Sequence, residues 1–267
     1  MKNFIYCSLL ALFFSSCTEI IEVDIPENTE KLMVEGNIST ELDSSFVRLS
    51  LTVPYFGDNK PYPVVPNATV NVNGVNFTYD TNGIYRPAKP YIGIVGNTYT
   101  LSVSYNGQQY SSSSFLEPMF QIDSIVPTYK EPIDFLEAGY TVTYYGKDTR
   151  SQVKNTYLRF GFKGVDSISD FYEDFRVLFD NKGQDPNRPL VFEVPFVRLA
   201  PGDTNILVFR SIDQAVYRYY LALNNRSDGG GPFSTPPANL PTNIKGKDAL
   251  GLFAAYDIKR YRTAIPK

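Results

Sequence analysis

Two Asn-Gly pairs, each beside segments in which apolar and polar residues alternate, constrain this fold more than any other feature. The first pair, Asn73-Gly74, lies between two short alternating runs rich in Val, and the second, Asn106-Gly107, follows such a run over residues 99–105. Asn and Gly tolerate the positive φ angles that a two-residue hairpin turn requires. The pattern therefore predicts two β-hairpins in this part of the chain.

Similar alternation extends over residues 31–116 and predicts about seven short strands, as in an immunoglobulin-like or fibronectin-like β-sandwich. After Glu117-Pro118 the apolar segments become longer and more aromatic. The chain has 20 Tyr and 19 Phe, residues that favour strands over helices. We therefore expect a mainly β protein, with a β-sandwich domain over residues 31–116 and a second β-rich domain over residues 117–267.

One segment of the second domain has helical periodicity. Ser211 is a candidate N-cap, and Gln214 completes a capping-box pattern, so we predict an amphipathic helix over residues 211–224. Its apolar positions follow the 3/4 spacing of a single stripe: Ile212, Ala215, Val216, Tyr219, Tyr220 and Leu223. We expect this stripe to pack on a sheet; the alternative is a face that binds a partner. Residues 250–256 are apolar enough for a buried closing strand.

The N-terminus has the pattern of a lipoprotein signal. Lys2 precedes an apolar run over residues 4–14, and Phe14-Ser15-Ser16-Cys17 resembles a lipobox. We predict that residues 1–16 are a signal peptide, that Cys17 is lipidated, and that residues 17–30 are an acidic tether. An ordinary secretory signal with an incidental cysteine is the alternative. Lipid on Cys17 would anchor the protein to a membrane.

Composition excludes several kinds of chemistry. The chain contains no histidine, which excludes a Ser-His-Asp triad, a Cys-His pair and any zinc site that uses histidine. Its two cysteines are Cys7, inside the signal, and Cys17, so a disulfide in the mature protein is not expected. A formal net charge of −3 argues against nucleic acid as a partner. We predict neither cofactor nor metal, and no enzymatic activity.

Two groups of oxygen-bearing side chains merit mention as weak candidates. Two carboxylates at a suitable separation could hydrolyse a glycoside without histidine, but the spacing of the first group gives no reason to expect this, and a solvated loop between strands explains it better. The second group could chelate Ca²⁺, but it lacks the ligand spacing of known calcium loops and is better explained as a turn. The first comprises Asp166, Asp170, Glu173 and Asp174, and the second Asp180, Asn181 and Asp185.

The long stretch over residues 226–248 is rich in Gly, Pro and Asn. Loops of this length are usually either functional or disordered, which makes this one a candidate partner-binding loop. The alternative is that the segment only straps over the sheet beneath it. The candidate residues are Pro232, Phe233, Pro236, Pro237, Asn239 and Asn243.

Several short motifs carry a resemblance to a known family. They are Cys17-Thr18-Glu19-Ile20-Ile21, Leu32-Met33-Val34-Glu35-Gly36, Gly96-Asn97-Thr98-Tyr99-Thr100-Leu101, the segment 231–244 and Leu250-Gly251-Leu252-Phe253. With these motifs the chain resembles uncharacterised Bacteroidetes lipoproteins whose genes often lie beside TonB-dependent outer-membrane receptors.

The resemblance implies a lipid-anchored outer-membrane protein, exposed at the cell surface or facing the periplasm. It would act as an accessory substrate-binding or capping partner of a TonB-dependent transporter. The alternatives are a structural or adhesive surface lipoprotein without a transporter partner, and a histidine-free hydrolase. The first alternative needs no transporter beside it, and the second needs a carboxylate pair that converges in a pocket.

Overall fold

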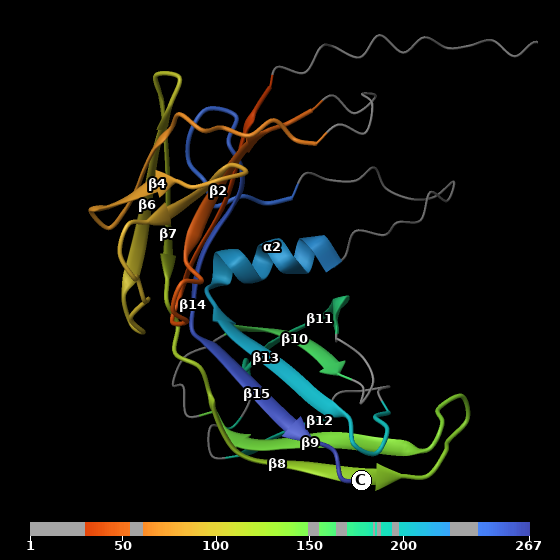
Figure 1. Cartoon of the computed structure of the whole chain (residues 1–267). Helices are drawn as coiled ribbons and strands as arrows, with labels where there is room; N and C mark the ends of the chain where they lie inside the picture. Colours follow the sequence, from red (N-terminus) through yellow and green to blue (C-terminus); the bar gives the residue numbers. More distant parts are fainter. Residues whose placement is uncertain are drawn as a thin grey trace, which may run out of the picture.

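The computed structural model describes residues 30–53, 61–148, 155–163, 170–183, 185, 188–193, 198–224 and 240–267. These residues form strands β1 to β15 and one helix, α2, which confirms the prediction of a mainly β protein with an amphipathic helix. The strands belong to three sheets, and α2 lies between the largest sheet and the two smaller ones (Figure 1). Among these residues, no helix is long and apolar enough to cross a membrane.

The largest sheet has eight strands in the order β14-β1-β2-β5-β4-β3-β6-β7. Their bounds are β1 (Leu32–Ser39), β2 (Phe46–Leu51), β3 (Thr69–Val72), β4 (Val75–Tyr79), β5 (Ile84–Pro87), β6 (Thr98–Tyr105), β7 (Gln108–Phe115) and β14 (Leu250–Tyr256). Both predicted hairpins are confirmed, as β3–β4 and β6–β7. Asn73 and Asn106 have φ angles of 48° and 47°, and the glycines that follow them also have positive φ angles.

This sheet curls until its first and last strands approach each other. The backbone N–H of Ala255 in β14 donates to Ser114 Oγ in β7 at 2.8 Å, and Ser111 of β7 exchanges two backbone hydrogen bonds with Lys245. The enclosed core is mainly aliphatic, with Val34, Ile38, Leu49, Leu101 and Phe253 among its fully buried side chains. The result is a nearly closed, barrel-like sandwich.

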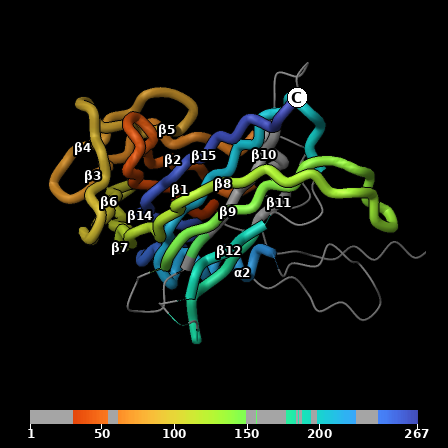
Figure 2. Tube along the Cα trace, turned by 90° about the horizontal axis from the view of Figure 1, so that it is seen from below, coloured from red at the N-terminus to blue at the C-terminus, as the bar shows by residue number. Residues whose placement is uncertain are grey.

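The two smaller sheets pack face to face. One has the order β12-β9-β8 and the other the order β11-β10-β13-β15. Seen from below, β8 and β9 run side by side, with β12 on the far side of β9 (Figure 2). The bounds are β8 (Gln121–Lys130), β9 (Gly139–Lys147), β12 (Pro189–Glu193), β10 (Asn155–Lys163), β11 (Asp170–Asp180), β13 (Thr204–Ile212) and β15 (Ile258–Ala264).

The core between these two sheets is aromatic. The Phe209 ring packs edge-on against Phe120 at 5.0 Å and Tyr261 at 5.7 Å between ring centroids. Tyr144 lies 6.0 Å from Phe209, and its hydroxyl accepts a hydrogen bond from the buried Asn205 amide. Burial raises the pKa of Tyr144 above its ordinary range.

The predicted start of the helix is wrong. Helix α2 spans Gln214–Asn224, and its N-cap is Asp213, whose Oδ1 accepts the Val216 N–H at 3.0 Å. Ser211 lies in β13, where its hydroxyl accepts the Asp257 N–H at 3.1 Å and donates to the Glu117 carbonyl. Ser and Asp are both favoured N-cap residues. Ser211 cannot cap the helix here because it belongs to a strand, so Asp213 caps it instead.

Strands β14 and β15 connect the two halves of the molecule. Residues 250–256 form the predicted buried strand, which pairs in parallel with β1, and the chain then passes through Asp257 into β15 of a smaller sheet. The eight-stranded sheet therefore contains strands from both predicted domains. Independent folding of residues 31–116 and 117–267 stays a prediction.

Candidate functional site

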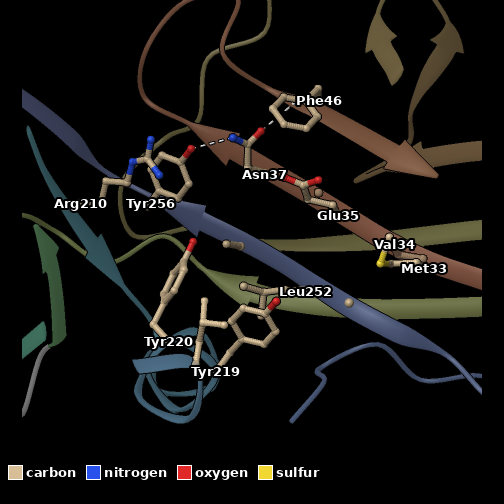
Figure 3. A pocket seen from close by; sticks show the side chains of 14 residues that line it. Met33, Val34, Glu35, Asn37, Phe46, Arg210, Tyr219, Tyr220, Leu252 and Tyr256 are labelled. Carbon is tan, nitrogen blue, oxygen red and sulfur yellow. Dashed lines mark hydrogen bonds between the residues drawn. The ribbon is translucent and has the colours of Figure 1, made fainter. Parts of the chain in front are cut away.

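A groove of about 490 Å³ lies between α2 and the outer face of the eight-stranded sheet (Figure 3). Its volume is within the range of small-molecule sites. Its floor is formed by β14, β1 and β2, which lie next to one another in the sheet. Its side chains come from five elements: Met33, Glu35, Asn37, Phe46, Arg210, Tyr219, Tyr220, Leu223, Leu252, Ala254 and Tyr256.

Strand alternation explains which residues of β1 and β14 face the groove. Val34 and Phe253 point into the aliphatic core, so their neighbours point to the other face of the sheet. Register then places Leu252 beside Glu35, and Ala254 beside Asn37. Position 251 must be glycine because it has φ +107°, and a Cβ there would lie 1.9 Å from the Val34 carbonyl oxygen.

The helix contributes the opposite wall. Val216 is buried against β13 and β14, whereas Tyr219 and Tyr220 are half-buried and extend from α2 towards the floor (Figure 3). Of the predicted apolar stripe, Val216 therefore packs in the core, whereas Tyr219 and Tyr220 line the groove. Ala215, which we assigned to the stripe, is exposed.

One end of the groove holds an ordered polar cluster. The Asn37 amide donates to Tyr256 Oη at 2.6 Å, and its oxygen accepts the Phe46 N–H at 3.2 Å. The Arg210 guanidinium lies over the Tyr256 ring, 4.8 Å from its centroid. Stacking on an aromatic face holds a guanidinium in one plane. These contacts hold Asn37, Tyr256 and Arg210 in one arrangement at this end of the groove.

A second ordered cluster lies nearby but supports structure. Arg260 binds Glu41 through two hydrogen bonds of 2.6 and 2.8 Å. These bonds hold the pKa of Glu41 below its usual range, and they raise the pKa of Arg260. Asp257 accepts from Thr40 Oγ1 at 2.8 Å and from the Met119 N–H at 3.3 Å. The Glu41–Arg260 bonds join β15 to the segment that follows β1, and Asp257 joins the β14–β15 connection to the same segment through Thr40.

Most predicted site residues lie outside the described part of the chain. These are Cys17, Pro232, Phe233, Pro236, Pro237, Asn239 and Asp166. Asp170, Glu173 and Asp174 belong to β11, but their side chains are not described. Asp180 accepts the Lys182 N–H in a tight turn. Within the described ranges, no cluster of three acidic or cysteine side chains is arranged to hold a metal.

Asn243 is the one candidate loop residue that the structure places. Its side-chain amide donates to the Phe253 carbonyl at 2.7 Å, and its oxygen accepts the Phe253 N–H at 2.9 Å. Its own carbonyl accepts from Ser112 Oγ of β7 at 2.9 Å. Asn243 therefore bridges β14 and β7 and helps to close the barrel-like sheet. A contact with a partner protein stays a prediction.

Sequence reasoning missed the strand side of the groove. Met33, Glu35 and Asn37 occupy the polar-facing positions of an alternating strand, where residues are usually solvated. Arg210 and Tyr256 lie far from them in sequence. The available signal was the tyrosine pair on the helix, for which we weighed a partner-binding face as the alternative.

One comparison with known proteins gives a match. The family model described as "Domain of unknown function (DUF4249)" matches residues 18–262, which covers nearly the whole chain. A comparison with curated proteins finds no match.

Proposed function

Because the chain belongs to the DUF4249 family, a domain of unknown function, we propose its role from its own residues: a lipid-anchored binding protein of the outer membrane that serves a TonB-dependent transporter. The observation that supports binding is the groove between α2 and the eight-stranded sheet, with its ordered polar cluster at one end. Lipid on Cys17 would keep this groove at the membrane surface.

A binding role fits this groove better than catalysis. Glu35 is the one carboxylate among the described residues that line it, and its Oε2 lies 3.2 Å from the Arg48 guanidinium. Acid–base hydrolysis of a glycoside needs two carboxylates on either side of the scissile bond. Nucleophilic hydrolysis needs a base within hydrogen-bond reach of the nucleophile, and the chain has no histidine for that task.

The proposed lipid anchor is tested by replacing Cys17, the residue that would carry the lipid. Cys17→Ser should move the protein from the detergent phase to the aqueous phase and from the membrane to the soluble fraction, because a serine hydroxyl cannot take the thioether-linked lipid. Cys7→Ser is the matched control and should leave the protein in the membrane. A Cys17→Ser protein that still fractionates with membranes would contradict the anchor.

The partner is tested by cross-linking in intact cells. The tagged wild-type chain should cross-link to a TonB-dependent receptor that mass spectrometry identifies, and Cys17→Ser should lose this product because it no longer shares the membrane. A membrane-bound wild type that cross-links to no such receptor would contradict the transporter role. That result would favour the alternative of a structural or adhesive surface protein.

A further inference from the structure

The Tyr256 hydroxyl is a hydrogen-bond donor at one end of the groove. Its Oη accepts from the Asn37 amide at 2.6 Å, and that amide is held in this orientation because its oxygen accepts the Phe46 N–H at 3.2 Å. The tyrosine proton therefore points away from Asn37. Within the described part of the chain, no acceptor takes it. Tyr256 is only 6% exposed and lines the groove, so the acceptor for this proton must lie in the groove.

The rest of the groove is mainly apolar. Met33 lies on the same face of β1 as Asn37 and four residues away, a separation of about 13 Å along an extended strand. Leu252 of β14 lies between them, because its register partner is Glu35 (Figure 3). Leu223 and the tyrosine pair of α2 contribute the opposite wall. A ligand that fills the groove therefore meets a hydrogen-bond donor at one end and apolar side chains along its length.

The charges of the groove favour an uncharged ligand. Glu35 and Arg210 are the charged residues of its described lining, and they are opposite in sign. Glu35 Oε2 lies 3.2 Å from the Arg48 guanidinium, and the Arg210 guanidinium stacks on the Tyr256 ring at 4.8 Å from its centroid. Both charges thus already contact groups of the protein. A charged ligand would lose its hydration here without a counter-charge reserved for it.

The floor of the groove does not suit a peptide. Strands β14, β1 and β2 use their backbone groups for pairing within the sheet, so the groove presents side chains rather than backbone donors and acceptors. A bound peptide would lose the hydration of its own N–H and C=O groups without gaining partners along most of its length. A ligand with polar atoms at one end avoids this loss.

We propose that the groove binds a small uncharged amphiphile, with an oxygen acceptor of its head at the Tyr256 hydroxyl and its apolar body along Leu252 and Met33. This inference rests on the proposed function, because it names the class of ligand for the same groove. The acceptor is a carbonyl, ether or hydroxyl oxygen, and it takes the place of a water molecule at the tyrosine proton. The apolar body displaces water from the leucine and methionine side chains.

The test uses the full chain with Cys17→Ser, titrated by calorimetry with 2-decanone, an uncharged ketone with an apolar tail. This probe should bind saturably at one site. Acetone has the head without the tail, and decanoate and decyltrimethylammonium have similar tails with a negative or a positive head. All three should bind at least tenfold more weakly. Equal or tighter binding of either charged probe, or no saturable binding of 2-decanone, would overturn the proposal.

One variant tests the head of the ligand. Tyr256→Phe keeps the ring on which Arg210 stacks and removes only the hydroxyl, so the affinity for 2-decanone should fall about threefold to tenfold, as expected for one neutral hydrogen bond. Tyr79→Phe is the matched control, because Tyr79 is an exposed tyrosine of β4 outside the groove, and it should bind as wild type does. Full affinity in Tyr256→Phe would contradict the assigned position of the head.

A second variant tests the tail and covers the case in which Tyr256→Phe does not fold. Met33→Glu places a charge at the apolar end of the groove and should lower the affinity for 2-decanone at least tenfold. Val75→Glu, at an exposed position of β4, is its control. Wild-type affinity in Met33→Glu would place the ligand elsewhere. Failure of these binding tests leaves the receptor cross-linking result intact, so the ligand class and the transporter role fail separately.

Discussion

The eight-stranded sheet and the pair of smaller sheets bury their apolar residues in different ways. The first distributes many Val, Leu and Ile side chains over eight strands and encloses them by curling. The second concentrates its core in a few aromatic rings between two sheets. An aromatic ring buries more surface than an aliphatic side chain. Truncation of one core side chain should therefore lower the free energy of unfolding more in the smaller sheets than in the eight-stranded sheet. Loss of the contacts that close the sheet should lower it more in the eight-stranded sheet.

The largest expected effect is that of Phe209→Ala in the aromatic core. Phe209 is 1% exposed and contacts four other rings, so its removal should cost about 3–5 kcal/mol of unfolding free energy. Leu101→Ala, fully buried in the aliphatic core, is the matched comparison and should cost less. Urea denaturation of the Cys17→Ser chain measures both. A larger loss of unfolding free energy in Leu101→Ala than in Phe209→Ala would contradict the expected difference between the two cores.

The next effect concerns the connection between the two regions. Asp257 is 5% exposed, and its carboxylate accepts from Thr40 and Met119. Asp257→Ala should cost about 2–3 kcal/mol, because it leaves two donors without their acceptor. Asp257→Asn keeps one acceptor oxygen and should cost less. We also expect a broader urea transition, since the regions would unfold less cooperatively; a sharp transition in Asp257→Ala would show that other contacts couple them.

Closure of the eight-stranded sheet is tested at Asn243. Asn243→Ala removes both side-chain hydrogen bonds to the Phe253 backbone and should cost about 1–2 kcal/mol. Asn76→Ala is the control, because Asn76 accepts a single exposed hydrogen bond from Asn71 on a hairpin. Thermal unfolding of the two variants gives the difference. Equal melting temperatures would show that the sheet stays closed without this bridge.

The smallest expected effect is at the exposed pair Glu41–Arg260. Because Arg260 holds the pKa of Glu41 below its usual range, the pair stabilises the fold at neutral pH, and this contribution disappears as the pH falls through the folded-state pKa. Glu41→Gln should therefore lower stability at pH 7 by less than about 1 kcal/mol, and wild type and variant should converge in acid. A difference that persists in acid would indicate a cause other than charge.

Local sequence patterns predicted the elements of this fold well. The Asn-Gly turns, the alternating strands and the closing strand at residues 250–256 are all present, because each depends on backbone preferences within a few residues. The start of the helix was predicted three residues too early. Ser211 and Asp213 can both cap a helix, and only the contacts of Ser211 with Glu117 and Asp257 decide between them.

The sequence by itself determined the β class, the two hairpins, the lack of histidine chemistry and the apolar stripe of the helix. Only the tertiary structure decided the groove, because its polar end joins Asn37 to Tyr256 across 219 residues. That contact exists because β14 pairs in parallel with β1, which the close approach at Gly251 permits. Pairing between segments so far apart in sequence depends on the whole core, and no local pattern encodes it.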